Sequence, residues 1–448
     1  MNITQQDTIA AIATPPGNGG VGIIRLSGGR AKAIAELLVK KELQARYAHY
    51  ASFYDFEGGI IDFGLVIYFP NPASFTGEDV VEIQGHGGAV ILDMLLRHVL
   101  SLGCRLANPG EFSERAFLNG KLDLAQAEAI ADLIESSTEQ SARSAQKSMQ
   151  GIFSEKINAF VEELIELRIY VEAAIDFVDE EIDFLSDGIV ESRVLRLLTA
   201  IQGILATAQQ GRLLRDGMTV VLAGKPNAGK SSLLNALAGH DAAIVTDIAG
   251  TTRDVLKERI QIEGMPLHII DTAGLRESDN AVEQEGVRRA HIEIQKADKI
   301  LLLIDASDPE SDSILKTLPV HISVTKVYNK IDLLNIEPEI IENEQGTQIY
   351  LSIKKERGMA LLKQHLKQSV GFDSATDNVF MARRRHIEAL NSGLGFVQSA
   401  LSQLQNNQAG ELVAEDLRQA QNDLAEITGE FSSDDLLGKI FSSFCIGK

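Results

Sequence analysis

Eight residues in the middle of the chain constrain its fold more than any others. Residues 224–231, GKPNAGKS, fit the pattern G-x-x-x-x-G-K-[ST] and lie between an apolar run ending at Leu222 and a helical run, Leu233–Leu237. The pattern requires a strand, a glycine-rich turn and a helix, because backbone N–H groups of the turn surround phosphate oxygens at the positive end of the helix. Lys230 is expected to reach the β and γ phosphates, and Ser231 to offer its hydroxyl to Mg²⁺. The segment predicts a doubly wound α/β domain that binds a nucleotide.

Two further motifs follow in the order that a GTP-binding protein requires. The D-x-x-G motif 271–274 comes after an apolar run and would bring the Asp271 carboxylate toward Mg²⁺ and the Gly274 amide toward the γ-phosphate. The N-K-x-D motif 329–332 follows another apolar run, and its Asp332 can accept hydrogen bonds from the ring N–H and the exocyclic amine of guanine. This pairing selects GTP over ATP, because adenine would leave a buried carboxylate unpaired.

The predicted nucleotide site joins these motifs to two neighbouring loops. Thr252 lies between the first two motifs and is the expected switch threonine on Mg²⁺, and residues 352–354 end the next strand, where they would support the base. The predicted GTP contacts are Asn227, Ala228, Gly229, Lys230, Ser231, Ser232, Thr246, Asp247, Ile248, Ala249, Gly250, Thr251, Thr252, Asp271, Thr272, Ala273, Gly274, Asn329, Lys330, Asp332, Ser352, Ile353 and Lys354.

The motifs do not fix the residue that orients the attacking water. Ras-like proteins carry a glutamine directly after the D-x-x-G glycine, whereas this chain has Leu275. Spacing alone does not choose among four acidic candidates downstream, which are Glu277, Asp279, Glu283 and Glu285. Charge between the β and γ phosphates can be neutralised by an arginine finger or by a monovalent cation, and Asn227 offers a carbonyl oxygen suited to the second. Potassium is therefore a candidate cofactor, with backbone carbonyls of 246–251 as further ligands.

Hydrophobic periodicity divides the rest of the chain. Residues 1–120 mix short β-like runs with glycine, whereas apolar residues recur three and four apart from about 122 to 215 and again after 378, as on buried helix faces. The last segment is short for an independent core and is expected to pack against the earlier helices. We predict a multidomain α+β and α/β protein with an N-terminal α+β domain 1–120, a helical domain 121–216 plus 372–448, and an inserted Ras-like P-loop G domain 217–371.

Composition limits the setting in which the chain works. Its formal net charge of −21 weighs against tight unaided binding of nucleic acid, because Lys and Arg contacts to phosphate supply most of the non-specific affinity. A partner is therefore expected to help hold any RNA. No apolar run approaches the roughly 18 residues of a membrane span, and two cysteines and nine scattered histidines make neither a disulfide framework nor a metal cluster. We expect a cytoplasmic protein with no membrane partner.

Several stretches together resemble the MnmE family of tRNA-modification GTPases, also written TrmE. They are Asn227 in the phosphate loop, DIAGTTRD at 247–254, the motif 271–275 and the terminal FCIGK at 444–448, and the resemblance covers the whole chain. The N-terminal glycine-rich segment 15–23 and NGKLD at 119–123 are similar to the folate-binding domain of that family. The resemblance implies a GTPase that, with the flavoprotein MnmG, modifies C5 of the wobble uridine (position 34) of certain tRNAs using a tetrahydrofolate one-carbon unit.

The resemblance also implies particular site residues. The expected catalytic residues are Glu283, Lys230 and Cys445. Glu283 is similar to the water-orienting glutamate of the family, and Cys445 would lie near the one-carbon chemistry, although a structural or idle thiol is an equal alternative. The implied Mg²⁺ ligands are Ser231 and Thr252, and the implied K⁺ ligands are Asn227, Thr246, Ile248 and Thr251. The implied ligands of 5-formyl- or methylene-tetrahydrofolate are Arg25, Glu82, Lys121 and Lys448. The family forms a homodimer through its N-terminal domains.

A second reading comes from another class of protein. The chain could be a GTPase switch in ribosome assembly or signalling, whose N-terminal domain binds a protein. A basic RNA-binding appendage would favour that reading, and the conspicuous basic cluster is Arg383–Arg385. Three arginines at the start of a helix are more often a solvated face than an RNA contact.

Overall fold

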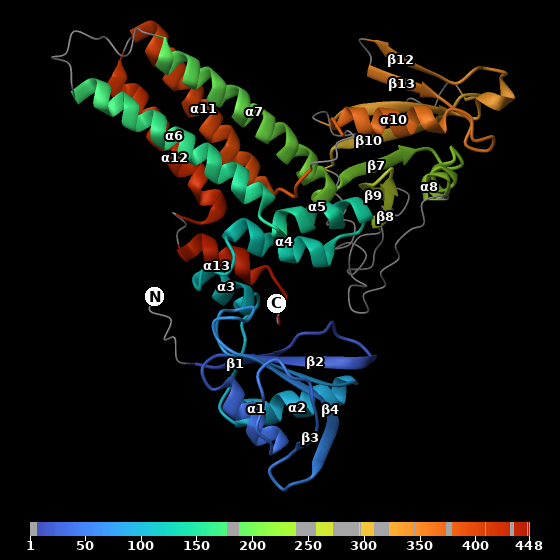
Figure 1. Ribbon diagram of the computed structural model, residues 1–448. Helices are drawn as coiled ribbons and strands as arrows, with labels where there is room; N and C mark the ends of the chain where they lie inside the picture. Colours follow the sequence, from blue (N-terminus) through green and yellow to red (C-terminus); the bar gives the residue numbers. More distant parts are fainter. Residues whose placement is uncertain are drawn as a thin grey trace. The chain divides into compact units, whose positions relative to one another are not determined.

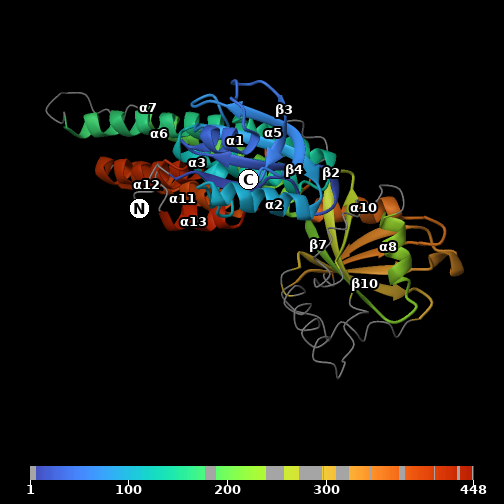
Figure 2. The same ribbon diagram turned by 90° about the horizontal axis from the view of Figure 1, so that it is seen from below.

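The computed structural model describes residues 7–176, 188–238, 257–271, 295, 297–308, 322–343, 346–372, 379–407, 409–430, 434–445 and 447. The chain forms two compact units (Figures 1 and 2). The first consists of residues 1–131, 148–198 and 392–448, and the second of residues 132–147 and 199–391. No helix in these described ranges is long and apolar enough to cross a membrane.

The first unit contains a six-stranded sheet with the strand order β3-β4-β5-β2-β1-β6. Neighbouring strands are antiparallel, except that β1 and β6 are parallel. Two helices, α1 (Ala31–Val39) and α2 (Ala89–Ser101), pack on one face (Figure 1). The strands are β1 (Ile9–Ile12), β2 (Gly19–Ser27), β3 (His49–Tyr54), β4 (Ile60–Phe69), β5 (Val80–Gly87) and β6 (Arg105–Leu106).

Alternation along the central strands decides which side chains reach each face. Ile24 and Leu26 of β2 are fully buried in the core with the two helices, so Arg25 between them points to the opposite face. The register pairs Arg25 with Glu82 of β5. The sheet therefore presents an acidic and a basic side chain side by side on the face that α1 and α2 do not cover.

Helices make up most of the remaining first unit. In α6 the predicted face is buried at Phe160, Leu164, Leu167 and Val171, and this helix packs along α12. Arg168 of α6 donates to the side chain of Gln421 of α12 at 2.8 Å. The helices wholly or partly in this unit are α3 (Glu111–Leu118), α4 (Leu124–Glu135), α5 (Glu139–Met149), α6 (Ile152–Asp176), α7 (Ile189–Asp216), α11 (Arg384–Asn407), α12 (Gly410–Thr428) and α13 (Asp434–Ser442).

The second unit is built on a seven-stranded sheet with the order β12-β13-β11-β10-β7-β9-β8. Its five central strands are parallel, and β8 and β12 add antiparallel edges. The strands are β7 (Met218–Gly224), β8 (Lys257–Ile262), β9 (Met265–Asp271), β10 (Lys299–Asp305), β11 (Val324–Asn329), β12 (Glu339–Asn343) and β13 (Gly346–Tyr350), with helices α8 (Lys230–Ala238) and α10 (Met359–Ser369). The predicted combination of an α+β region, helices and a doubly wound α/β region is confirmed.

Candidate functional site

The glycine-rich turn lies where the sequence predicts it, between β7 and α8. Gly224 has φ 148° and Gly229 has φ 105°, a region that side chains disfavour. A Cβ on Gly224 would lie 2.4 Å from the Leu303 carbonyl oxygen, and one on Gly229 would lie 2.6 Å from the side-chain Nδ2 of Asn329. Both glycines are therefore required, because neighbouring strand ends approach the turn closely.

Lys230 closes this turn with its own side chain. Its Nζ donates hydrogen bonds to the carbonyl oxygens of Gly224 at 2.7 Å and Lys225 at 3.1 Å. The ammonium group is thus held inside the loop, where phosphate oxygens are expected to bind. Asn227 at the outer bend is exposed and has φ 65°, a left-handed conformation that asparagine tolerates.

Asn329 connects three segments of the predicted nucleotide site. The residue is 4% exposed, and its Nδ2 donates to the carbonyl oxygen of Ala228 at 3.0 Å. Its Oδ1 accepts the Ile353 N–H at 3.1 Å. One carboxamide therefore fixes the phosphate loop, the N-K-x-D motif and the 352–354 turn to one another.

A turn at Lys330 and a hydrogen bond from Ser352 position the carboxylate of Asp332, the predicted guanine contact. Lys330 adopts φ 69°, which turns the chain into the short 3-10 helix Ile331–Leu333. Ser352 is fully buried and donates to Asp332 Oδ1 at 2.5 Å. This hydrogen bond, aided by the nearby charge of Lys354, holds the pKa of Asp332 below its ordinary value and keeps the carboxylate ionised.

Two carboxylates at this site belong to none of the predicted motifs. Asp305 ends β10 and contacts Lys330, and Asp308 in the following turn contacts Lys225 of the phosphate loop. Burial alone would raise the pKa of Asp305, but hydrogen bonds from Lys330 and Ser307 outweigh it and hold that pKa low. The available signal was an acidic residue directly after the apolar run 300–304.

Much of the predicted switch and cation site lies outside the described residues. For Mg²⁺ only Ser231 is described, and for K⁺ only Asn227, while Asp271 is placed by its backbone at the end of β9. The predicted residues outside the described ranges are Thr246, Asp247, Ile248, Ala249, Gly250, Thr251, Thr252, Thr272, Ala273, Gly274, Glu283 and Lys448.

In the first unit, the structure pairs two of the predicted folate ligands with each other. Arg25 donates from Nε at 3.1 Å and from Nη2 at 2.9 Å to Oε1 of Glu82. The guanidinium carbon lies 5.6 Å from the ring centre of Phe75 and 5.7 Å from that of Phe112, within cation–π range. Sequence reasoning treated the two charges as independent and missed both aromatic residues.

The third folate candidate and the C-terminal segment approach the same region. Lys121 donates to the Pro72 carbonyl oxygen at 3.1 Å, in the loop that also carries Phe75. The carbonyl oxygen of Cys445 accepts the Gly110 N–H at 3.3 Å, two residues before Phe112. Cys445 is exposed, whereas burial raises the pKa of the Cys104 thiol to about 11. Cys445 is thus the more accessible of the two thiols.

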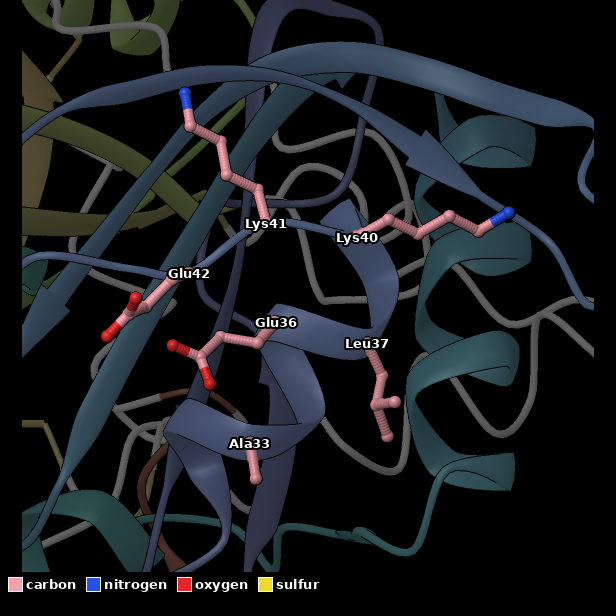
Figure 3. A pocket seen from close by; sticks show the side chains of 6 residues that line it. All are labelled: Ala33, Glu36, Leu37, Lys40, Lys41 and Glu42. Atoms are coloured by element: carbon pink, nitrogen blue, oxygen red, sulfur yellow. The ribbon is translucent and has the colours of Figure 1, made fainter.

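A surface hollow along α1 is a poor candidate for a functional site (Figure 3). Two of its charged groups serve the local fold: Glu36 accepts the Leu43 N–H at 2.9 Å, and Lys40 lies 4.4 Å from the ring centre of Tyr54. None of the predicted site residues lines the hollow, whose lining is Ala33, Glu36, Leu37, Lys40, Lys41 and Glu42.

The glycine-rich turn at the end of β7, the Asn329 bridge and the fixed Asp332 carboxylate define a P-loop protein of the guanine-nucleotide-binding class. A family model described as the MnmE helical domain matches residues 124–445, and one described as the GTP-binding protein TrmE N-terminus matches residues 8–121. The chain belongs to the MnmE (TrmE) family of GTPases. Membership in a GTPase family implies GTP binding.

Curated relatives match along the entire chain. The tRNA modification GTPase MnmE of Hydrogenovibrio crunogenus is 60% identical over 451 residues, covering 100% of both chains. That of Marinobacter nauticus is 59% identical over 99% of both chains. Among solved structures, the FeoB G-domain from Methanococcus jannaschii is 24% identical, covers 34% of this chain and 98% of its own, and has a TM-score of 0.25.

Proposed function

We propose that this chain is a potassium-stimulated GTPase that acts in tRNA modification in the cytoplasm. Together with the flavoprotein MnmG, it would modify C5 of the wobble uridine at position 34 of certain tRNAs, using a one-carbon unit from 5-formyl- or methylene-tetrahydrofolate. The observation that carries the GTPase part is the Asn329 carboxamide, which holds the phosphate loop at Ala228 and the base-supporting turn at Ile353. The tRNA part is supported by the relatives, which are tRNA modification GTPases.

In this proposal the second unit binds and hydrolyses GTP. Lys230 pairs with the β and γ phosphates, which replace the loop carbonyls as its partners, and Asp332 reads guanine. Ser231 and Thr252 would hold Mg²⁺, which neutralises phosphate charge. Asn227, Thr246, Ile248 and Thr251 would hold K⁺, and Glu283 would orient the attacking water. The exposed Asn227 side chain at the bend of the loop supports the cation role, because it can turn toward a ligand without breaking a core contact.

The first unit would bind the folate. Its face offers the Arg25 guanidinium beside the partly exposed Phe75 ring, which suits a molecule with a flat polar ring system and glutamate carboxylates. Glu82 would accept a hydrogen bond from the pteridine and keep one from Arg25. Lys121 and Lys448 would pair with the folate carboxylates. Cys445 would lie near the transferred carbon, consistent with its backbone contact to Gly110.

The uncovered face of the same sheet supports a homodimer. Tyr50, Phe63 and Leu65 are 72%, 46% and 37% exposed, and Tyr50 lies opposite Leu65 on neighbouring strands. Large apolar side chains grouped on one sheet face are typical of a protein contact surface. We assign this surface, in an N-terminal domain spanning 1–120, to a second copy of the chain. The other proposed domains are a helical domain 121–216 plus 372–448 and a G domain 217–371.

The first test is GTP turnover in potassium buffer against sodium buffer at matched ionic strength. We expect faster turnover in potassium, loss of that preference in Asn227→Ala, and slow hydrolysis with retained GTP binding in Glu283→Ala. Asp279→Ala is the matched control for Glu283, since it removes a neighbouring acidic charge. Equal turnover of the unaltered protein in both salts would remove the potassium mechanism and favour a GTPase switch in ribosome assembly or signalling.

A second test addresses the folate site separately. Equilibrium dialysis with 5-formyl-tetrahydrofolate should show binding that falls at least tenfold in Arg25→Gln, because the charge-assisted contact is lost. Arg97→Gln on α2, an exposed arginine paired with Asp93, serves as the control and should bind normally. Equal affinity of the Arg25 and Arg97 variants would exclude this face as the folate site.

A further inference from the structure

A short turn lies between the two loops that recognise the nucleotide. In the sheet, β10 is flanked by β7, which leads into the phosphate loop, and by β11, which leads into the N-K-x-D motif. Figure 2 labels β7 and β10. Asp305 is the last residue of β10 and residues 306–308 follow it, so the turn leaves the sheet at the same edge as both loops. The turn is closed by the Asp308 N–H, which donates to the Asp305 carbonyl oxygen at 2.9 Å.

The Asp305 carboxylate accepts hydrogen bonds from Ser307 with one oxygen and from Lys330 with the other. Its Oδ1 accepts the N–H of Ser307 at 3.0 Å and the Ser307 hydroxyl at 2.6 Å. Its Oδ2 accepts from the Nζ of Lys330 at 2.6 Å, and the two side chains are 22% and 35% exposed. A short ion pair with one partner fixed in advance loses little side-chain freedom when it forms.

Asp308 makes a similar contact with the phosphate loop. Its Oδ2 lies 3.2 Å from the Nζ of Lys225, the residue directly after Gly224. The side chains of this pair are 46% and 35% exposed, so water and salt weaken the attraction more than at Asp305. The two carboxylates thus contact one lysine in each nucleotide motif, with unequal strength.

We propose that Asp305 and Asp308 are positioning residues for nucleotide recognition. Asp305 holds Lys330 in its left-handed turn and so aims Asp332 at guanine, and Asp308 holds the first bend of the phosphate loop through Lys225. The inference rests on the proposed nucleotide site. It assigns a part in base specificity to the turn 305–308, which contains none of the motif residues.

The consequence for Asp332 follows from chain geometry. Lys330 has φ 69°, a conformation that costs a lysine free energy unless neighbouring contacts hold it. Asp332 lies two residues later, in the turn that begins there. Release of Lys330 therefore loosens the carboxylate that distinguishes guanine from a base without the exocyclic amine.

The test is titration of a fluorescent GDP analogue, with competition by GDP and by IDP, which lacks the exocyclic amine. In Asp305→Ala we expect the Kd for GDP to rise roughly tenfold and the preference for GDP over IDP to shrink. Asp305→Asn keeps an acceptor for Ser307 and Lys330 and should recover part of both. Asp298→Ala is the matched control, because Asp298 caps the opposite end of β10 by accepting the Thr219 N–H at 2.7 Å.

A double-mutant cycle separates positioning from general damage to the fold. If Asp305 acts through Lys330, adding Asp305→Ala to Lys330→Ala should change the GDP Kd less than twofold. Additive losses, or an unchanged preference for GDP over IDP in Asp305→Ala, would overturn the assignment of Asp305. The Asp308→Ala variant should weaken binding about threefold in 50 mM KCl and much less in 500 mM KCl. No effect at low salt would overturn the assignment of Asp308.

Two further variants distinguish failure of this inference from failure of the proposed function. Lys230→Ala and Asp332→Ala should both weaken GDP binding strongly. If neither does, the nucleotide site itself is misassigned and the inference falls with it. If both do and the Asp305 variants match the Asp298→Ala control, the site stands and the positioning role alone is refuted.

Discussion

Removal of the Asp132 carboxylate is the most informative perturbation of the second unit's stability. Asp132 in α4 has a side chain only 3% exposed and accepts hydrogen bonds from Arg215 at 2.8 Å and from Arg383 at 2.7 and 3.2 Å. Arg215 precedes β7 by three positions, and Arg383 directly precedes α11. One buried acid therefore ties together segments from α4, α7 and α11 around the nucleotide-binding sheet.

The expected magnitude follows from the burial of the two arginines. Breaking a buried ion pair costs about 3–5 kcal/mol, because the remaining charge is left without a partner. Arg383 is 14% exposed and should show most of that cost, whereas Arg215 is 31% exposed and can turn partly to water. We expect Asp132→Ala to lower the free energy of unfolding by about 3 kcal/mol, and Asp132→Asn, which keeps an acceptor, by about 2 kcal/mol.

Urea unfolding followed by far-ultraviolet circular dichroism is the suitable assay, since the chain contains no tryptophan for fluorescence. GDP identifies the transition that belongs to the second unit, because ligand binding stabilises only that transition. With a urea dependence of about 2–3 kcal/mol per molar, the midpoint should fall by about 1 M.

The control removes an exposed carboxylate from a similar pair. Glu337→Ala breaks the Glu337–Arg357 contact in the same unit, whose side chains are 85% and 42% exposed, and should cost about 0.5 kcal/mol or less. If Asp132→Ala shifts unfolding no more than Glu337→Ala does, the three-residue cluster does not hold the second unit together and the argument from burial is wrong.

Three further results are expected from other parts of the second unit. Gly211→Ala should destabilise this unit by about 2 kcal/mol, because the new Cβ would lie 1.9 Å from the Phe380 carbonyl oxygen. A Cβ on Gly203 in the same helix meets nothing within 4 Å, so Gly203→Ala should stabilise the unit by about 0.5–1 kcal/mol. Thermal unfolding of both variants tests the contrast. Burial, together with the charge of Lys299, lowers the pKa of His365 below its ordinary 6.5, so the unfolded state binds a proton more readily and stability should fall as the pH drops below about 6.5. Urea midpoints measured at several pH values should depend less on pH in His365→Gln than in the unaltered protein. An unchanged pH dependence would contradict the assignment. Asn329→Ala should raise the Kd for GTP by about 100-fold, because the hydrogen bonds to Ala228 and Ile353 are lost together. A rise of less than threefold in calorimetric titration would refute the bridging role of Asn329.

The structure also shows how far the sequence could be read. The phosphate loop lies between a strand and a helix as the sequence predicts, because it is a contiguous motif whose glycine positions specify a local backbone conformation. The roles assigned to Thr252, Glu283 and Lys448 stay predictions, since these residues lie outside the described ranges.

What the sequence determined by itself is the class of the chain and the chemistry of its nucleotide loops, because short-range spacing dictates turns and helix starts. Only the tertiary structure decided which charges meet. Arg25 and Glu82 are 57 positions apart and pair through strand register, and Asp132 and Arg383 are 251 positions apart and meet through helix packing. Such contacts depend on how complete strands and helices bury their apolar faces, and a local pattern holds no information about that choice.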